Sequence, residues 1–553
     1  MKNLRIAVAY YRTLTSQSSA SLTAGYLTAH LRHSGLHVDI HQLEIVDAAS
    51  DVGALIDAKP SLLFYKPNFQ DIHRLTANLS ALTTRFPAIR IGLFGPFAVL
   101  NSEMLLRHHQ EVRGILLPNH EFLAAANASW WIGDTMVTAL EGVISRGRHG
   151  ISFKQADPTL VVTNAYRLLP ARDIEKKEPI VIANLEASRG CVHACTFCHI
   201  PEFARTGGVP ILRRSVEDVI KELRELYADG KRYFIFNDAI LGGGGSADGV
   251  VWLRELADQL CAEPLEYYFM GYFTPDLLER HPALFEKLAE AGLVRVFVGL
   301  EAATTGELQR FKKPAAISRY TFLKSWLQDR YIVPHIGFMP FHPFAKPSEL
   351  LSGIEFLYTH GEIHRFATIR ERTRLVPGTE LMRQAEEAGL TFCYETDTPN
   401  RYRFANLNTQ SLYDRMNAAW DKIGVPVLER LEHLFVTGFF IENMVRRLQL
   451  TDQHFLQVSH AFHEAHTRHA TEFFTMTKRL ISSPVLQLHD RATFAILLQE
   501  VQQCWTALMD AATRNGLEVP VSWITTGDLR SEIARPASYD GRWSTTRSGR
   551  LDA

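Results

Sequence analysis

Residues 188–201 read SRGCVHACTFCHIP, which places Cys191, Cys195 and Cys198 within eight positions of a loop led by Gly190. Thiolates this close along the chain can fold back onto one soft metal centre. Structural zinc sites and closed iron–sulfur cubes take four ligands, so three cysteines leave one position open for a cofactor or substrate. The count and spacing therefore predict a metal centre with one open position, which would be reactive if the metal is iron.

Two histidines lie inside the same loop, so zinc remains an alternative to iron as the bound metal. A zinc site completed by His193 or His199 is the main alternative, although these neighbours of the cysteines would strain the geometry. The other cysteines, Cys261, Cys393 and Cys504, stand alone and are expected to be buried apolar residues. Six cysteines in 553 residues are too few for a disulfide framework.

The cysteine loop follows the first strand of an alternating series of strands and helices. Ser215 and Asp218 open one of the helices, and Gly230 ends it. About five or six such units favour a barrel or partial barrel, in which chemistry gathers at the carboxyl ends of the strands. The expected strands cover residues 179–187, 231–238, 265–273, 294–300, 333–341 and 366–376.

The C-x3-C-x-aromatic-C loop and the series behind it, about 220 residues, resemble the radical S-adenosylmethionine (SAM) superfamily. The resemblance implies that Cys191, Cys195 and Cys198 hold a 4Fe-4S cluster whose fourth iron binds the amino and carboxylate groups of SAM. It also places Phe197 beside the adenine. An electron from the cluster would then cleave SAM to methionine and a 5'-deoxyadenosyl radical.

Further positions match later motifs of the family. The resemblance makes Asn237 and Asp238 candidates near the methionyl amine and Glu301 a candidate for the ribose, and it brings the backbone of Gly337, Phe338 and Met339 to the adenine. Simpler structural roles remain open for the polar residues. Asn237 and Asp238 can cap a loop, and Glu301 can begin a helix. The glycines at 242–245 are expected to form a flexible loop.

The first 145 residues alternate apolar runs with amphipathic stretches, which predicts a flavodoxin-like (Rossmann-like) parallel sheet. This segment resembles the cobalamin-binding domains that precede some radical SAM domains, with Gly95 in the loop after the fourth strand. Two stretches depart from that pattern, Lys66-Pro67-Asn68 and the sequence LPNHE that ends at Glu121. Cobalamin binding therefore stays open, and a domain that only caps the barrel is the alternative.

The expected fold class is α/β. It combines the flavodoxin-like sheet, a radical SAM partial (β/α)6 TIM-type barrel and a mostly helical C-terminal region. We expect a linker where SRGRHGISFKQADPT looks loop-like, and a disordered polar tail. The predicted divisions are 1–145, 146–178, 179–402, 403–525 and 526–553.

Composition narrows the partners. Lys and Arg number 59 against 60 Asp and Glu, and this net charge of -1 makes a nucleic acid partner unlikely. No uncharged apolar run approaches the roughly 18 residues that span a bilayer. The N-terminus lacks the pattern of a signal peptide, so we expect a cytoplasmic protein without a membrane partner.

The resemblance predicts a radical SAM enzyme that methylates a small molecule with cobalamin and receives electrons from a flavodoxin- or ferredoxin-type protein. Without cobalamin, the same cluster would drive a rearrangement, cyclisation or oxidation. A metal-stabilised binding or regulatory protein is the alternative from another class, and a nucleic-acid-modifying radical enzyme is a weaker one. Tyr272 and His342, at predicted strand ends, are noted without a role.

Overall fold

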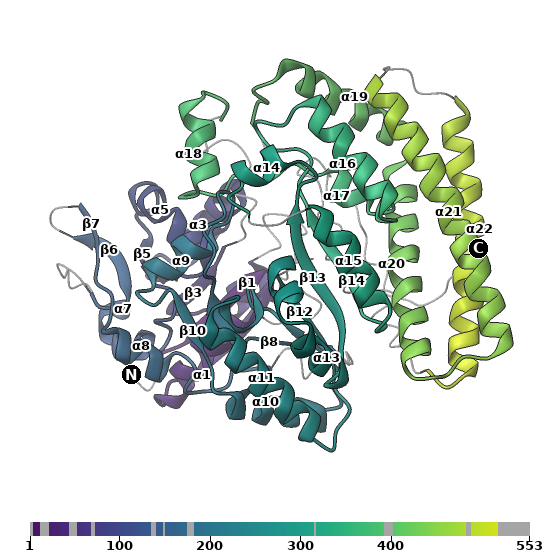
Figure 1. Ribbon diagram of the computed structural model, residues 1–553. Helices are drawn as coiled ribbons and strands as arrows, with labels where there is room; N and C mark the ends of the chain where they lie inside the picture. Colours follow the sequence, from purple (N-terminus) through teal and green to yellow (C-terminus); the bar gives the residue numbers. More distant parts are fainter. Residues whose placement is uncertain are drawn as a thin grey trace.

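The structure is a computed structural model of the 553-residue chain. It describes residues 4–11, 21–43, 52–67, 72–133, 140–147, 150–173, 182–313, 317–391, 402–482 and 488–517. Figure 1 shows two sheets side by side and a layer of long helices beyond the second sheet. The predicted tail, 526–553, lies outside the described residues.

The first sheet is the expected flavodoxin-like sheet. Its parallel strands follow the order β2-β1-β3-β4-β5, as in other doubly wound folds of this type. Alternate residues of β1 enter opposite cores, with Val8 on one face and Ala9 on the other, because helices cover both faces. The strands are β1 (Ile6–Tyr11), β2 (Val38–Leu43), β3 (Leu62–Lys66), β4 (Arg90–Leu93) and β5 (Val112–Leu116). The helices are α1 (Leu22–His33), α2 (Gly53–Ala58), α3 (Ile72–Arg85), α4 (Pro96–Leu100), α5 (Ser102–His108), α6 (Leu123–Ala126) and α7 (Ala128–Ile132).

The stretch expected to be loop-like is ordered structure instead. Strands β6 (Val143–Gly147) and β7 (Gly150–Phe153) form an antiparallel hairpin that extends the first sheet, and helix α8 (Pro158–Asn164) starts at its N-cap Asp157. An edge hairpin needs few apolar residues: here Val143 and Ile144 enter the core, and Ile151 packs against it partly buried. The polar composition therefore hid the hairpin. The division into domains stays a prediction.

The second sheet carries the βα series and has the parallel order β14-β13-β12-β11-β8. Helix α10 begins at the predicted cap, where the Ser215 hydroxyl accepts a hydrogen bond from the Asp218 amide. The strands are β8 (Ile182–Leu185), β11 (Tyr233–Phe236), β12 (Tyr268–Phe273), β13 (Leu293–Glu301) and β14 (Val333–Phe338). The accompanying helices are α9 (Ile200–Thr206), α10 (Val216–Ala228), α11 (Ala247–Ala262), α12 (Pro275–Arg280), α13 (Pro282–Glu290), α14 (Thr305–Arg310), α15 (Ile317–Gln328), α16 (Pro347–Thr359) and α18 (Glu380–Glu387).

The sixth strand, expected at 366–376, was a wrong prediction. This segment forms helix α17 (Phe366–Arg370) and then contacts the end of the sheet through a single bridge between Phe341 and Arg372. The Glu432 carboxylate accepts a hydrogen bond from the Ala367 amide, which fixes the first turn of the helix. Tertiary contacts with the C-terminal helices thus override a local pattern that also suits a strand.

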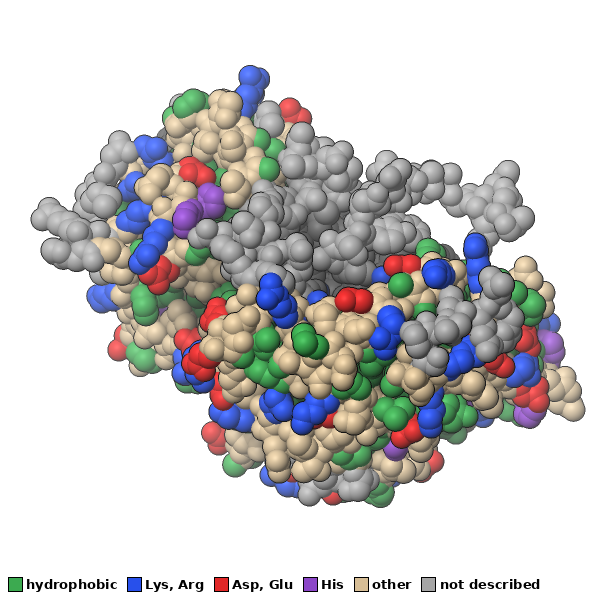
Figure 2. All heavy atoms as spheres, turned by 90° about the horizontal axis from the view of Figure 1, so that it is seen from above, with side chains coloured by type: hydrophobic (Ala, Val, Ile, Leu, Met, Phe, Trp, Pro, Cys, Tyr) green, Lys and Arg blue, Asp and Glu red, His purple; other side chains and the backbone are tan. Residues whose placement is uncertain are grey.

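The C-terminal region is helical, as predicted, and consists of α19 (Leu407–Ile423), α20 (Val425–Arg447), α21 (Gln453–Ser482) and α22 (Leu488–Arg514). Its apolar faces share one continuous core with the second sheet. Within the described chain, none of the helices combines the length and the apolar character that a membrane crossing requires. Figure 2 shows Lys, Arg, Asp and Glu side chains interspersed over the coloured surface of one face, in keeping with the net charge of -1.

Candidate active site

The cysteine loop starts from a fixed backbone. Strand β9 (Ser188–Gly190) pairs antiparallel with β10 (Ile211–Arg213), and the loop leaves this pair at Gly190. Gly190 has φ +94°, and a Cβ there would lie 1.9 Å from the carbonyl oxygen of Pro210. Only glycine fits this close approach. The three cysteines follow directly, ahead of helix α9.

Asp238 holds the chain just before the loop. Its carboxylate accepts hydrogen bonds from the amide of Ala187, at 2.9 Å, and from the hydroxyl of Ser188. Burial raises the pKa of Asp238 to about 7. Asn237 is exposed, and its amide donates to the carbonyl of Leu185. The structure therefore gives Asp238 a positioning role, while contact of either residue with SAM stays a prediction.

Cys191, Cys195 and Cys198 are free thiols, each partly exposed. Three sulfurs on one zinc ion would lie roughly 3.8 Å apart, given a Zn–S distance of about 2.3 Å. Among the described residues, however, the three cysteines and the two neighbouring histidines supply no three ligand atoms within 4.8 Å of one another. A cluster in which each cysteine binds a different iron needs wider spacing than one ion, so the donor set suits a cluster better than zinc.

A buried ion pair lies beside these thiols. Lys313 Nζ is 3.1 Å from Glu301 Oε1, and their side chains are 9% and 10% exposed. Burial raises the pKa of Cys191 and of Cys195, and the positive charge of Lys313 opposes that rise. Lys313 thus supplies positive charge where thiolates are needed, although no motif in the sequence indicates this role.

The backbone directs Glu301 toward this lysine. Glu301 ends β13 with φ +75°, in the left-handed region, and the pairing with β14 shifts register there. A Cβ on Gly299 would lie 2.5 Å from Glu301 Oε1, and one on Gly337 would lie 3.2 Å from Oε2. Both glycines therefore make room for the carboxylate.

Other predicted residues meet at an apolar wall near the thiols. The rings of Phe197 and Phe311 are 5.5 Å apart, and Met339 packs in the same cluster. The amide of Met339 donates to the Glu301 carbonyl at 2.8 Å. Phe338 instead stacks on Phe356 in the core. The structure thus groups Phe197, Glu301 and Met339, together with Gly337, while the Phe338 side chain packs elsewhere.

The first sheet meets the cysteine loop at Arg189. Its Nη1 donates to Asn119 Oδ1 and to Glu121 Oε1, both at 3.0 Å, and its Nε pairs with Glu186 at 2.7 Å. Asn119 and Glu121 follow strand β5, so they lie at the carboxyl edge of the first sheet. The stretch that departs from the cobalamin-domain pattern therefore holds this edge to the cysteine loop.

Gly95 lies at the same edge, after β4, with φ +89°. The Lys66 side chain covers it, with Cγ 3.1 Å from the position of a Cβ, and its amine donates to the Ser21 hydroxyl at 2.9 Å. Burial lowers the pKa of Lys66 to about 8. A flexible side chain, rather than backbone, thus stands over the predicted corrin residue.

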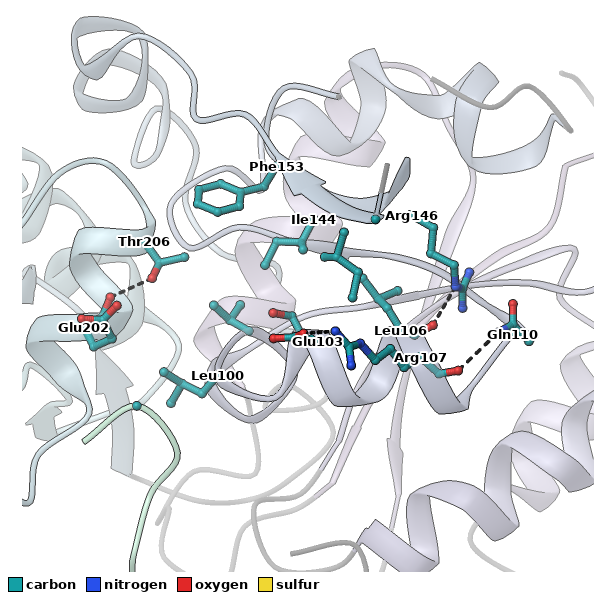
Figure 3. A pocket seen from close by; sticks show the side chains of 15 residues that line it. Leu100, Glu103, Leu106, Arg107, Gln110, Ile144, Arg146, Phe153, Glu202 and Thr206 are labelled. Carbon is teal, nitrogen blue, oxygen red and sulfur yellow. Dashed lines mark hydrogen bonds and ion pairs between the residues drawn. The ribbon is translucent and has the colours of Figure 1, made fainter. Parts of the chain in front are cut away.

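A surface groove of about 840 Å³ lies between α5, the β6–β7 hairpin and α9 (Figure 3). Leu100, Ile144 and Phe153 give it apolar walls, and Glu103 pairs with Arg107 along one side. Its described lining contains neither cysteine nor histidine, so it is separate from the thiol site.

The solitary cysteines differ from expectation. Cys261 is exposed and Cys504 partly exposed, so neither is the buried apolar residue that was predicted. Cys261 lies on a helix surface, where a small side chain is tolerated without burial, whereas Cys504 packs against the main apolar core. Cys393 lies outside the described residues.

Residues 185–332 match the model of the Radical SAM superfamily. Over 125 residues, 21% of this chain, it is 31% identical to MJ0865 of Methanocaldococcus jannaschii, a protein named as a methylthiotransferase, and the match spans 26% of that relative. The cobalamin-dependent SAM radical enzyme OxsB, solved with aqua-cobalamin and SAM, is similar with a TM-score of 0.66 and 14% identity, over 93% of this chain and 80% of OxsB. The radical SAM methyltransferase TsrM from Kitasatospora setae is similar with a TM-score of 0.56 and 16% identity, over 69% of this chain and 76% of TsrM.

Proposed function

We propose that this chain, a radical SAM enzyme by its family match, methylates a carbon atom of a small molecule with cobalamin as the methyl carrier. When bound, the 4Fe-4S cluster supplies the electron that cleaves SAM to methionine and a 5'-deoxyadenosyl radical. Two SAM molecules would be used per turnover, one for the radical and one to methylate the corrin. A flavodoxin- or ferredoxin-type protein would deliver the electron.

The chain's own residues would bind and orient these groups. Cys191, Cys195 and Cys198 would hold three irons, since they are free thiols on one fixed loop. Glu301 would accept hydrogen bonds from the ribose hydroxyls, and Phe197 and Met339 would form an apolar wall beside the adenine. The positive charge of Lys313 would favour the thiolate forms of Cys191 and Cys195.

The joining of the first sheet to the cysteine loop supports the methyl transfer most strongly. Arg189 stands two residues before Cys191 and binds Asn119 and Glu121 at the carboxyl edge of that sheet. Ligands of open α/β sheets bind outside the carboxyl ends of the strands. A corrin at this edge would therefore lie beside the SAM site, as the transfer requires. The similar enzyme OxsB carries cobalamin.

A second candidate is a radical SAM rearrangement, cyclisation or oxidation without cobalamin. Lys66 covers Gly95, and Asn119, His120 and Glu121 are only 2%, 0% and 3% exposed. Both ring nitrogens of His120 already have hydrogen-bond partners, the Pro118 carbonyl and the Ala156 amide, and so neither is available to a corrin. These contacts favour a first domain that only caps the second sheet.

Corrin binding separates the two candidates. The protein would be purified without oxygen, supplied with iron, sulfide and hydroxocobalamin, and freed of unbound ligands. Methyl transfer predicts about four irons, as in a 4Fe-4S cluster, and about one corrin per chain. The variant Gly95→Val should keep the iron and lose the corrin. Gly35→Ala, at a positive φ with open space around it, is the matched control.

The same preparation, incubated with SAM carrying a labelled methyl group and a reductant, tests the product. A labelled carbon-methylated compound supports methyl transfer. Iron without corrin would contradict it and favour the second candidate.

A further inference from the structure

Three side chains outside the thiol site converge on one point. Glu307, His342 and Glu349 each bring a ligand atom within 4.8 Å of the other two, and they form the one such set among the described residues. Glu307 lies on α14 and Glu349 on α16, while His342 follows β14. Nitrogen and carboxylate oxygen are the donors that zinc, manganese and ferrous ions accept in proteins.

His342 lacks the hydrogen bonds that a buried histidine normally makes. Its side chain is 0% exposed, and neither ring nitrogen forms a hydrogen bond. Its Nε2 lies 3.5 Å from Glu307 Oε1, and the ring packs edge-on against Phe311. Buried polar atoms in native structures almost always form a hydrogen bond, so a buried histidine whose ring nitrogens form none indicates a missing ligand.

The two glutamates have local roles that use only part of each carboxylate. Both stand in the first turn of a helix, where Oε2 of Glu307 accepts from the Thr304 hydroxyl at 2.7 Å and Oε2 of Glu349 accepts from the Lys346 amide at 2.9 Å. Helix capping accounts for these bonds. It does not account for the convergence of both carboxylates on His342.

The charge of the buried Glu307 carboxylate also supports a bound cation. Glu307 is 3% exposed, and among the described residues its carboxylate has no lysine or arginine partner. Buried carboxylates are normally paired or bind metal ions. Two carboxylates and a neutral imidazole would balance a divalent cation, with water completing the coordination.

The backbone around His342 is held in place before any ion binds. The amide of Ala345 donates to the His342 carbonyl at 2.9 Å, and the Tyr402 hydroxyl donates to the Phe341 carbonyl at 2.8 Å. The Thr409 hydroxyl donates to the Ala345 carbonyl at 2.8 Å. Fixed ligands of this kind lower the cost of assembling a metal site.

We propose that Glu307, His342 and Glu349 bind one divalent transition-metal ion, separate from the iron–sulfur centre. The ion would join α14, α16 and the segment after β14. Thr196, between two of the cysteines, binds the end of α14 through its amide to the Phe311 carbonyl, at 3.1 Å, and through its hydroxyl to the Arg310 carbonyl, at 3.0 Å. The ion would therefore also fix the contact that holds the cysteine loop.

The test measures zinc in the full-length holoprotein. After anaerobic cluster loading, incubation with Zn²⁺ and desalting, the protein should retain about one zinc per chain in addition to the iron of the cluster. His342→Ala and Glu307→Gln should each lower zinc retention about tenfold or more. His364→Ala, which removes another buried histidine, is the matched control and should retain zinc.

A variant without the loop thiols excludes zinc at the cysteines. The triple variant C191A/C195A/C198A should still bind one Co²⁺, with visible absorption bands but without the intense thiolate charge-transfer band. If His342→Ala does not fold, zinc retention is measured in Glu349→Gln instead. This variant should fold, because glutamine keeps an oxygen that accepts from the Lys346 amide and Glu349 is only partly buried.

Two results would overturn the proposal. One is a holoprotein that retains no zinc and a triple variant that binds no Co²⁺ at millimolar concentration. The other is a triple variant that binds no Co²⁺ together with a His342→Ala protein that retains zinc, which would assign the metal to the cysteines.

Discussion

Glu301 shows how much of the site depends on one residue's backbone. A left-handed conformation is costly for a residue with a side chain and persists only where the surroundings impose it. Here Gly299 and Gly337 leave the space that the carboxylate fills, and Lys313 pairs with it. Such strain at the end of a strand is typical of ligand sites.

Variants that remove the charges of Glu301 and Lys313 should distinguish the effect of this ion pair on stability from its effect on SAM binding. Glu301→Gln leaves Lys313 buried without its partner, so the free energy of unfolding should fall by about 3–5 kcal/mol. The double variant Glu301→Gln/Lys313→Met should regain most of that stability, yet still bind SAM more weakly than the wild type does. Urea unfolding and equilibrium dialysis of SAM measure the two effects. Restored SAM affinity in the double variant would show that Glu301 only neutralises Lys313.

The sequence could predict some site residues and not others. Cys191, Cys195 and Cys198 follow from local spacing, because ligands within one loop must be neighbours along the chain. Lys313 could not be predicted, since it reaches the thiols only through the turn at Glu301 and the following helix. The sequence predicts only that His342 lies at a strand end, because the lack of hydrogen bonds at its ring nitrogens is a property of the three-dimensional structure.

Among the elements, the short β9–β10 pair determines the start of the cysteine loop. Gly190→Ala should disrupt it, because the new methyl group would meet the Pro210 carbonyl oxygen at 1.9 Å. We expect iron content after cluster loading to fall by more than half, although all three cysteines remain. Gly230→Ala is the control for positive φ alone, since nothing lies within 4 Å of its Cβ, and it should cost about 1–2 kcal/mol without affecting iron. Equal iron contents in the two variants would contradict the steric account.

The contact between α17 and α20 should depend on pH. Burial raises the pKa of Glu432 to about 8, so the ionised form is disfavoured in the folded protein. Stability from this group is full below its unfolded pKa, near 4.5, and is lost as the pH rises through about 8. Glu432→Gln keeps an acceptor for the Ala367 amide and lacks the titration. Its melting temperature relative to wild type should therefore rise between pH 6 and pH 9.

Scanning calorimetry at these two pH values checks this prediction. Glu464→Gln, on the exposed side of α21, is the control and should follow the wild type at both. A Glu432→Gln difference that stays constant, or falls, with rising pH would contradict the assignment.

The elements were predictable where their signals were local. A cap such as Ser215, or the apolar run of one strand, depends only on residues a few positions apart in the sequence. The sixth strand failed because α17 is fixed by Glu432, 65 positions further along the chain. The β6–β7 hairpin was missed because an edge needs few apolar residues.

For the whole molecule, Arg189 is a buried link between the first sheet and the start of the cysteine loop. Arg189→Met would leave Glu121, only 3% exposed, without its partner, and we expect a loss of about 3–5 kcal/mol in unfolding free energy. Arg205→Met is the matched control, because its pair with Glu202 is exposed and should contribute at most about 1 kcal/mol. Equal losses in the two variants would show that the interface does not depend on Arg189.

The fold class and the order of the three regions were predictable from the sequence, and the similarity to OxsB over 93% of the chain agrees with them. The contacts between the regions could not be predicted. Arg189 is about 70 residues from Asn119 and Glu121 in the sequence, and only the fold brings it to them. That interface is where the proposed methyl transfer would take place.

The most direct test of the central claim is SAM cleavage by the cluster-loaded protein. Under anaerobic, reducing conditions, the wild type should form 5'-deoxyadenosine and methionine from SAM, and Cys195→Ala should form neither. Gly230→Ala, whose glycine stands in open space, should retain the activity. A wild-type protein that binds zinc in place of iron, or that leaves SAM intact with a full cluster, would contradict the account.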